Sequence, residues 1–384
     1  MKKVIAITIL LLTVFQSYSQ IKRDSIYIGI SGRVDTTDLE VKQVYYLFKN
    51  YLESRPDSVY DNPYWNEEEK LVNPLRLPAT FYTGFYNLQA SPKVIFSYWK
   101  PFILSIVKKN ETKYFLRIAL IKDDNDPSKI ITILNVNAIF ENEKWVLQNV
   151  LKDIENSWNT TQFKYIKYVY PKSHKFNDSL AKKAVDFCDS IARRMNISKF
   201  DSINFYVCDN PDEMGLLLGY EFYYINYTTG MTLKWLNQIL SSKGNEYYPH
   251  EFVHMILDKK NINRCYLIEE GLCCFLGERN TLKYKKPILQ LGNDYLQNKP
   301  SYTLDSLLSN TTINNGYQTE YPTGSIIAEI VFNKKGYEGL KALSDANTKT
   351  PEDIYKTIKN ITGLNKIKFE IEFRKMLSKL KENT

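Results

Sequence analysis

Several features that mark whole classes of protein are scarce or missing in this sequence of 384 residues. After the first twenty residues it has no run of eighteen apolar residues, so nothing later in the chain predicts a transmembrane helix. Its 51 lysine and arginine residues are scattered. A nucleic-acid-binding protein would gather them on one face, so no nucleic-acid partner is expected. The chain has no internal repeat and no low-complexity segment, and these absences leave a globular fold.

Cysteine and histidine are both rare. The five cysteines form no CxxC pair, and we interpret most of them as buried, small apolar residues. They are Cys188, Cys208, Cys265, Cys273 and Cys274. An exported location would permit a disulfide between Cys188 and Cys208, although sequence alone gives no geometry for it. Only three histidines are present, so their positions are informative.

The N-terminus has the pattern of a secretory signal peptide. Lys2 and Lys3 precede the apolar run Val4–Phe15, and a small-residue stretch follows. We therefore predict a signal peptide over residues 1–19 and an exported mature protein, periplasmic or secreted, with no membrane span. A retained N-terminal anchor is the alternative, because the small-residue stretch contains no alanine. No cysteine follows the apolar run, which argues against a lipoprotein.

The mature chain is long enough for two domains, and we expect the first over residues 20–160. A helical repeat of apolar residues begins behind Thr37 and Asp38, which can cap a helix. Its members are Val41, Tyr45, Phe48 and Leu52. Four strand-like segments follow: Phe102–Val107, Tyr114–Ile121, Ile130–Phe140 and Lys144–Val150. Their short turns favour an antiparallel meander, and one helix laid across such a sheet resembles the cystatin-like cone folds.

The second domain is predicted over residues 161–384. The segment Asn156–Lys175 has little helical period and ends near Pro171, so we place the domain boundary there. A helix is expected over Asp178–Met195, and mostly helices toward the C-terminus. Three strand-like segments lie between them: Ile203–Cys208, Tyr220–Tyr227 and Met231–Leu240. The whole chain therefore reads as an α+β protein, in which a mainly helical domain with a small sheet follows an antiparallel sheet with one helix.

The most informative segment is an HExxH sequence from His250 to His254, inside an apolar, helix-like run. Residues four apart lie on one face of a helix, so the two imidazoles can converge on one cation. Glu251 is rotated away from that pair and could take the proton of a metal-bound water. By chance this pattern would arise on the order of once in a thousand such chains. The third histidine, His174, has no partner at ligand spacing, and we assign it no role.

Two histidines leave a metal short of a protein ligand, and a carboxylate is expected. Glu269 and Glu270 lie in a second strongly apolar run, where an unpaired charge would be costly. Gly271 would let this helix and the HExxH helix approach closely, which favours Glu270 as the ligand. Two other interpretations are open. Both acids could only cap a helix N-terminus, or the metal could be a structural zinc, whose site usually closes four protein ligands.

An HExxH sequence followed sixteen residues later by Glu-Gly-Leu resembles the gluzincins, a family of zinc metallopeptidases, and in particular their aminopeptidase-like branch. The resemblance covers about residues 165–380. It implies a thermolysin-like domain, Zn²⁺ held by His250, His254 and Glu270, and Glu251 as the general base. Three residues depart from the family's WLxEGLAxY-like segment: Leu267 for tryptophan, Cys273 for alanine and Phe275 for tyrosine.

A second element of the same resemblance begins at Tyr321, where Tyr-Pro-Thr-Gly precedes an apolar helix, as in the family's YxxG segment. The family's tyrosine stabilises the oxyanion, so the resemblance implies that role for Tyr321, with Tyr317 as the nearest competitor. Family members also lay substrate along an edge strand before the metal helix, and Met231–Leu240 is the candidate strand. No segment like the family's exopeptidase signature precedes His250.

The sequence thus predicts an exported, zinc-dependent metallopeptidase that acts on a peptide or protein substrate, with zinc as the cofactor. Zinc would lower the pKa of a bound water, and Glu251 would take its proton. Two other functions stay open. One is a non-catalytic binding protein built on a zincin scaffold, and the other is a zinc amidase acting on cell-wall material, because the same metal chemistry serves other amides.

Overall fold

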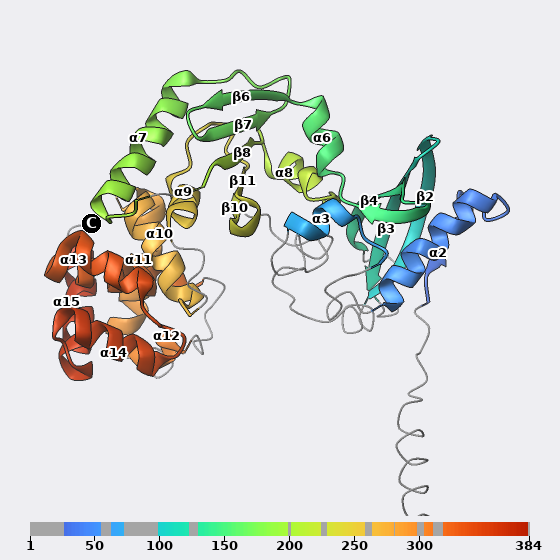
Figure 1. The fold of residues 1–384 in the computed structure, drawn as a ribbon. Helices are drawn as coiled ribbons and strands as arrows, with labels where there is room; N and C mark the ends of the chain where they lie inside the picture. The colour runs from blue at the N-terminus through green and yellow to red at the C-terminus, as the bar shows by residue number, and fades with distance from the viewer. Residues whose placement is uncertain are drawn as a thin grey trace, which may run out of the picture. The chain divides into compact units, whose positions relative to one another are not determined.

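The chain folds as a mixed α+β protein, with two sheets among the residues that the structure describes, and this confirms the fold class at that level (Figure 1). The computed structural model describes residues 27–54, 63–72, 99–122, 130–198, 201–223, 229–257, 263–279, 281–297, 303–309 and 318–382. The predicted signal peptide lies outside them. Within the described residues, no helix is long and apolar enough to cross a membrane.

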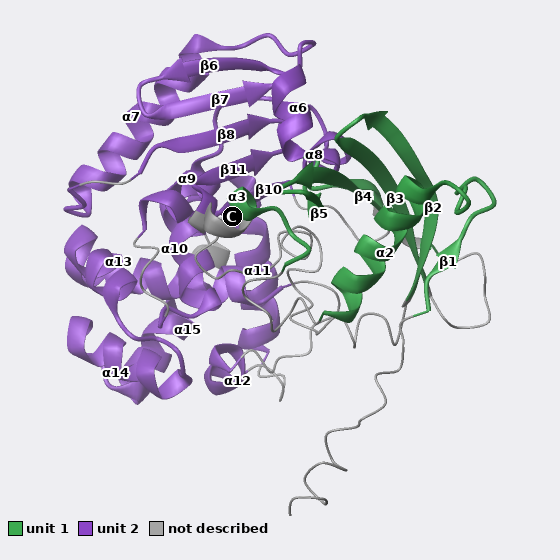
Figure 2. Ribbon diagram, turned by 45° about the vertical axis from the view of Figure 1, so that its right-hand side comes forward, with its two compact units in different colours: residues 1–150, 218–225 green, residues 151–217, 226–384 purple. Residues whose placement is uncertain are grey.

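Contacts divide the chain into two compact units (Figure 2). The first unit comprises Met1–Val150 and Leu218–Ile225, and the second comprises Leu151–Leu217 and Asn226–Thr384. The chain therefore leaves the first unit after Val150, returns to it for eight residues, and then completes the second. The limits expected from the sequence, 20–160 and 161–384, remain a prediction of the domains.

The first unit is built on an antiparallel meander, as its short turns predict. Its strands are β2 (Trp99–Asn110), β3 (Lys113–Lys122), β4 (Ile130–Glu141) and β5 (Lys144–Gln148). A short β1 (Gly29–Ile30) pairs in parallel with β2. The strand β9 (Tyr220–Tyr223) pairs antiparallel with the first part of β4. We expected that strand in the second domain, and this expectation was wrong, because the chain returns to the first sheet.

Helix α2 (Leu39–Glu53) supplies the other half of the first core. Asp38 is its N-cap and accepts hydrogen bonds from the backbone N–H groups of Glu40 (2.8 Å) and Val41 (3.1 Å). One face of α2 is buried together with apolar side chains of the sheet: Val44, Leu47, Phe48, Tyr51 and Leu52. A short helix, α3 (Glu67–Val72), lies between α2 and β2 in sequence.

The second unit has a five-stranded sheet in the order β10-β11-β8-β7-β6. Its strands are β6 (Asn159–Phe163), β7 (Ile166–Tyr170), β8 (Ile203–Val207), β10 (Gly230–Leu233) and β11 (Gln238–Ser241). The three central strands are parallel, while β10 and β6 pair antiparallel at the two edges. The segment Asn156–Lys175 is therefore not a linker. It lacks a helical period because it holds two strands, and Ile166, Tyr168 and Tyr170 alternate into the core.

Helices make up the rest of the second unit, as predicted. Helix α6 (Leu151–Ser157) precedes the first strand of this sheet, α7 (Asp178–Arg194) lies between β7 and β8, and α8 (Pro211–Leu217) follows β8. After the sheet come α9 (Pro249–Ile256), α10 (Tyr266–Glu278), α11 (Leu282–Leu296), α12 (Leu304–Leu308), α13 (Glu320–Asp345), α14 (Pro351–Thr362) and α15 (Lys366–Glu382). One continuous apolar core joins α7 and the helices from α9 onward to the sheet.

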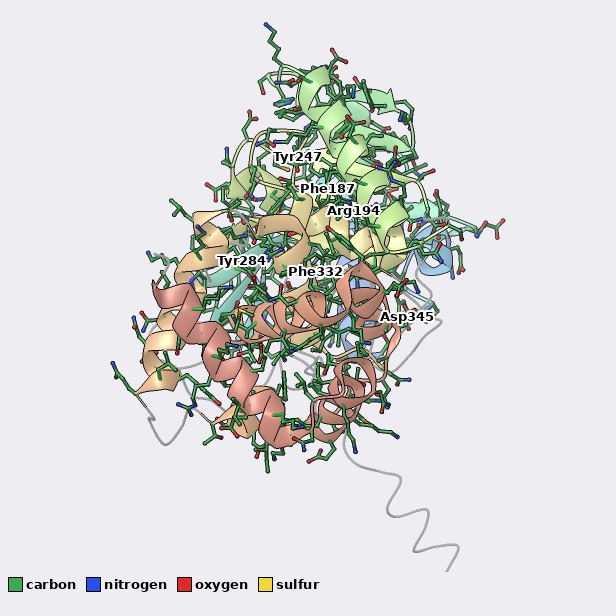
Figure 3. The ribbon with its side chains drawn as sticks, turned by 90° about the vertical axis from the view of Figure 1, so that its left-hand side faces the viewer. Phe187, Arg194, Tyr247, Tyr284, Phe332 and Asp345 are labelled. Carbon is green, nitrogen blue, oxygen red and sulfur yellow. The ribbon has the colours of Figure 1, made fainter. Side chains whose placement is uncertain are left out.

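Helix α9 is held between this sheet and α7. Phe252 of α9 stacks on Phe205 of β8, with ring centroids 5.2 Å apart. Just before α9, Tyr247 meets Phe187 of α7 edge to face, at 6.1 Å between centroids (Figure 3). Both contacts use apolar side chains of this segment, while His250 and His254 face Glu270 of α10.

Candidate metal centre

Helix α9 carries the three polar residues of the HExxH sequence into the interior. Pro249 occupies its first turn, where a missing N–H costs nothing. The side chains of His250, Glu251 and His254 are all buried. The two imidazoles are one turn apart, and their ring centroids are separated by 5.1 Å. The helix thus places both rings side by side, as the four-residue spacing predicts.

Helix α10 brings Glu270 to both imidazoles. Its Oε2 atom lies 3.1 Å from Nε2 of His250 and 3.5 Å from Nε2 of His254. Two ligand atoms of a tetrahedral zinc ion, each about 2.1 Å from the metal, are about 3.4 Å apart. The two observed separations fall close to that edge length. Glu270 therefore approaches both imidazoles at separations close to those between two ligands of one metal ion.

The other ring nitrogen of each histidine faces a different carboxylate. Nδ1 of His254 lies 2.8 Å from Oε1 of Glu269, and Nδ1 of His250 lies 3.6 Å from Oε2 of Glu278. Histidine ligands usually donate their second N–H to a carboxylate, which fixes the ring and its tautomer, and the 2.8 Å contact of His254 is within hydrogen-bond distance. The sequence interpretation missed Glu278. Its position in the same apolar helix as Glu270 was the available signal.

Glu269 is the most heavily paired carboxylate of the site. Besides His254 it accepts hydrogen bonds from Lys234 and from Arg264, whose Nη1 also donates to the backbone carbonyl of Ser344 at 2.6 Å. Burial raises the pKa of Glu269, but Lys234, His254 and Arg264 outweigh it and hold the pKa well below its usual value.

The N-cap of α10 is Cys265, without a side-chain capping hydrogen bond. Glu269 and Glu270 thus contact the histidines, which favours the metal interpretation over simple helix capping.

The charges of the site suit a divalent cation. Burial lowers the pKa of His250 and of His254. Cys274 and then Glu270 at His250, and Cys273 and then Glu270 at His254, outweigh burial and hold both pKa values well above 6.5. Burial raises the pKa of Glu270, and the two histidines bring it down to about 2. Without a metal, the site therefore holds protonated imidazoles against carboxylates. A divalent cation would take the place of those protons.

Glu251 is held from the sheet side. Thr232 of β10 donates a hydrogen bond of 2.7 Å from its Oγ1 to Oε2 of Glu251. A Cβ atom at Gly230 would lie 2.7 Å from the other carboxylate oxygen, so only glycine leaves room there. Thr232 was not recognised from the sequence, although it lies in the predicted edge strand. The structure divides the predicted strand Met231–Leu240 in two: β10 (Gly230–Leu233) is at the edge of its sheet, whereas β11 (Gln238–Ser241) lies between β10 and β8.

Tyr321 lies beside the histidines, in the first turn of α13. Its ring stacks on that of His250 with centroids 6.2 Å apart, and its hydroxyl is 2.7 Å from the hydroxyl of Tyr266. Burial, followed by the nearby charge of Glu270, raises the pKa of Tyr321, so its hydroxyl keeps its proton at neutral pH. Its role toward an oxyanion remains a prediction. Tyr317, its competitor, lies outside the described residues.

Glycines let the helices around the site meet backbone to backbone. A Cβ atom at Gly271 would lie 2.1 Å from the carbonyl carbon of Gly324, so Gly271 faces α13. The sequence argument placed that close approach against the HExxH helix, and this was wrong. The glycine that meets α9 is Gly277, where a Cβ atom would lie 2.7 Å from the backbone nitrogen of His250.

Two cysteines of α10 also lie at the histidines. Two sets of three side chains hold their ligand atoms within 4.8 Å of one another: His250, His254 and Cys273, and His250, Cys274 and Glu278. Glu270 belongs to neither set, although its separations from both Nε2 atoms fit a metal. All five cysteines are free, so the disulfide considered between Cys188 and Cys208 is not formed. Four of the five are buried, as expected, but the position of two of them beside the histidines was missed.

His174 has partners that its sequence position did not predict. Its Nε2 atom lies 2.8 Å from Oε1 of the fully buried Glu246, and its Nδ1 atom lies 3.5 Å from Asp209. Sequence spacing gave His174 no metal-ligand partner and no role, and it could not indicate the observed partners because Glu246 and Asp209 are distant in sequence. Glu246 also accepts a hydrogen bond of 3.0 Å from the backbone of Asn177. It thus ties the turn before α9 to the start of α7.

Comparison of the chain with protein-family models and with curated proteins gave no match.

Proposed function

We propose that the protein is an exported zinc-dependent metallopeptidase whose metal is held by His250, His254 and Glu270. One observation carries the proposal. Both Nε2 atoms face a single oxygen of Glu270, at 3.1 and 3.5 Å, while each Nδ1 atom faces another carboxylate. Such rings are oriented as metal ligands usually are. A chance pair of buried histidines would have no reason to share this orientation.

The reaction we infer is hydrolysis of a peptide bond. Zinc would bring the pKa of a water to about 7 and would polarise the scissile carbonyl. Glu251 accepts the proton of the attacking water and passes it to the leaving amine. Thr232 keeps the Glu251 carboxylate in place for both transfers. Tyr321, which keeps its own proton, donates to the developing oxyanion.

The finer family assignment belongs to the same proposal. We infer a gluzincin-type second unit, because the HExxH helix is followed by a helix that carries the third ligand and is preceded by an edge strand that reaches the base. Substrate would lie along β10. For the first unit, one helix packed on an antiparallel meander supports a cystatin-like fold.

Replacing Glu251 with glutamine tests the base. We expect Glu251→Gln to retain zinc, as measured by atomic absorption, and to lose peptide cleavage by at least a hundredfold, since general acid–base catalysis contributes about 10²–10⁴ in rate. Glu338→Gln is the matched control, because Glu338 is an exposed acid of α13 in the same unit. Cleavage by Glu251→Gln close to that of wild type would end the assignment of the base.

A digest of a mixed peptide library, read by mass spectrometry, tests the substrate class. Zinc-dependent cuts would support a peptidase, and their positions would separate endo- from exo-cleavage. A parallel digest of purified cell-wall peptidoglycan covers the zinc amidase. Zinc binding without cleavage in either digest would favour the second candidate function, a non-catalytic binding protein, because a nearby cysteine could close the metal's coordination shell.

A further inference from the structure

Helix α10 presents a second potential ligand on the face that carries Glu270. Cys273 follows Glu270 by three residues, so the two side chains leave the helix on the same side. The Cys273 side chain is fully buried. Its sulfur and one ring nitrogen each of His250 and His254 lie within 4.8 Å of one another. The thiol thus belongs to a cluster of three metal-ligating groups drawn from two helices.

The Cys273 sulfur and the two imidazoles form one set of metal-ligating groups, and Glu270 approaches the Nε2 atom of each imidazole. With zinc–sulfur and zinc–nitrogen bonds of about 2.3 and 2.1 Å, a sulfur and a nitrogen ligand lie about 3.6 Å apart. The observed upper limit of 4.8 Å exceeds that separation by about 1.2 Å, so the sulfur and each nitrogen would have to approach by at most about that distance. Helix α9 would then supply two ligands one turn apart, and α10 would supply a carboxylate and a thiolate. Thiolate ligands are well suited to zinc and cobalt.

We propose that Cys273 is a fourth protein ligand of the metal, so that the centre rests in a closed His₂-Glu-Cys form and must release the thiolate before water can bind. This inference rests on the proposed zinc site. Binding breaks the S–H bond as the sulfur–metal bond forms, and the proton goes to solvent. Metal sites with four protein ligands are closed, while catalytic sites keep one position for water. Cys273 would therefore keep the hydrolase inactive until the thiolate leaves.

Cobalt substitution of the full mature chain tests the ligand directly. A thiolate bound to Co²⁺ gives a strong charge-transfer absorption in the near ultraviolet, whereas nitrogen and oxygen ligands alone give only weak visible bands. We expect the charge-transfer band in wild type, its loss in Cys273→Ala, and its retention in Cys274→Ala and Cys265→Ala. Cys273→Ser, which preserves volume, should lose the band as well. Cobalt affinity should fall at least tenfold in both Cys273 variants.

Any result that differs from this expectation would contradict one part of the proposal. Visible cobalt bands without charge transfer in wild type would remove Cys273 from the coordination shell and leave the proposed zinc site standing. Loss of the band in Cys274→Ala alone would assign the sulfur to the other cysteine. Absence of any cobalt spectrum would overturn the zinc site itself. Zinc-saturated Cys273→Ala should turn over several-fold faster than wild type, and an unchanged rate would refute the resting closed form.

Discussion

The contact between Gly271 of α10 and Gly324 of α13 makes a strong prediction about stability and metal binding. In Gly271→Ala the new Cβ atom would lie 2.1 Å from the carbonyl carbon of Gly324. That is more than an ångström inside the normal contact of about 3.5 Å between carbon atoms. The obstacle is helix backbone and cannot rotate away, so the two helices must part. Overpacking of this kind costs about 1–3 kcal/mol, and a backbone obstacle favours the upper end.

Alanine also stabilises a helix by about 1 kcal/mol relative to glycine, which offsets part of the overpacking cost. Gly271→Ala should therefore lower the free energy of unfolding by about 2 kcal/mol. Gly292→Ala is the matched control in α11, because its Cβ would be 3.8 Å from the nearest atom, Cδ2 of Leu377. That variant should be more stable than wild type by about 0.5–1 kcal/mol. Both variants would be unfolded in urea with a chelator present, so that metal binding does not contribute.

The same displacement should reach the metal centre, because Glu270 is the neighbour of Gly271 and Tyr321 lies one turn before Gly324. We expect Gly271→Ala to bind zinc at least tenfold more weakly than wild type, as measured by competition with a coloured chelator, while Gly292→Ala binds as wild type does. If Gly271→Ala proved as stable as the control variant, the backbone contact between α10 and α13 would not exist, and the reasoning would fail.

Thr232→Val removes a hydrogen bond to a charged group, worth about 1.5 kcal/mol or more, so turnover should fall about tenfold at unchanged zinc content in kinetic and metal assays. Full activity would show that Thr232 does not hold the base. The two histidines, whose pKa values are raised, stabilise the metal-free fold at low pH, and this contribution is lost as pH rises through the raised values. Glu270, whose pKa is lowered to about 2, stabilises the fold above about pH 4.5, and this contribution is lost as pH falls toward 2. Zinc must displace the histidine protons, so calorimetry should show a larger rise in melting temperature with zinc at pH 8 than at pH 6; an equal rise would contradict this. Glu246→Leu leaves His174 without its 2.8 Å partner and should cost about 1–3 kcal/mol in urea unfolding, and a loss below about 0.5 kcal/mol would refute that role.

Local spacing explains what could be predicted from the sequence. His250 and His254 share a helix face whatever the rest of the chain does, and α2 follows from the apolar repeat behind Asp38. Short turns between neighbouring strands likewise lead to the meander of the first unit. Each of these features depends on residues only a few positions apart, so the sequence contains the whole signal.

Contacts between distant segments left no such signal. The contacts that place Glu278, Cys273 and Thr232 at the site form only when α10 and β10 pack against α9. The mixed sheet of the second unit was hidden because its first two strands, β6 and β7, are only five residues each and read as a linker. Similarly, nothing near residue 220 shows that this strand pairs with Thr132–Leu134.

The return of β9 to the first sheet has a consequence for synthesis on the ribosome. Backbone groups of Thr132–Leu134 pair with β9, so this edge stays open until residue 223 has been added. At about 5–20 residues per second, the eighty or so residues after β4 take roughly 4–16 s to translate. During that interval the nascent sheet exposes an edge able to pair with other chains. A fragment ending at residue 160 would keep that edge open permanently and should aggregate.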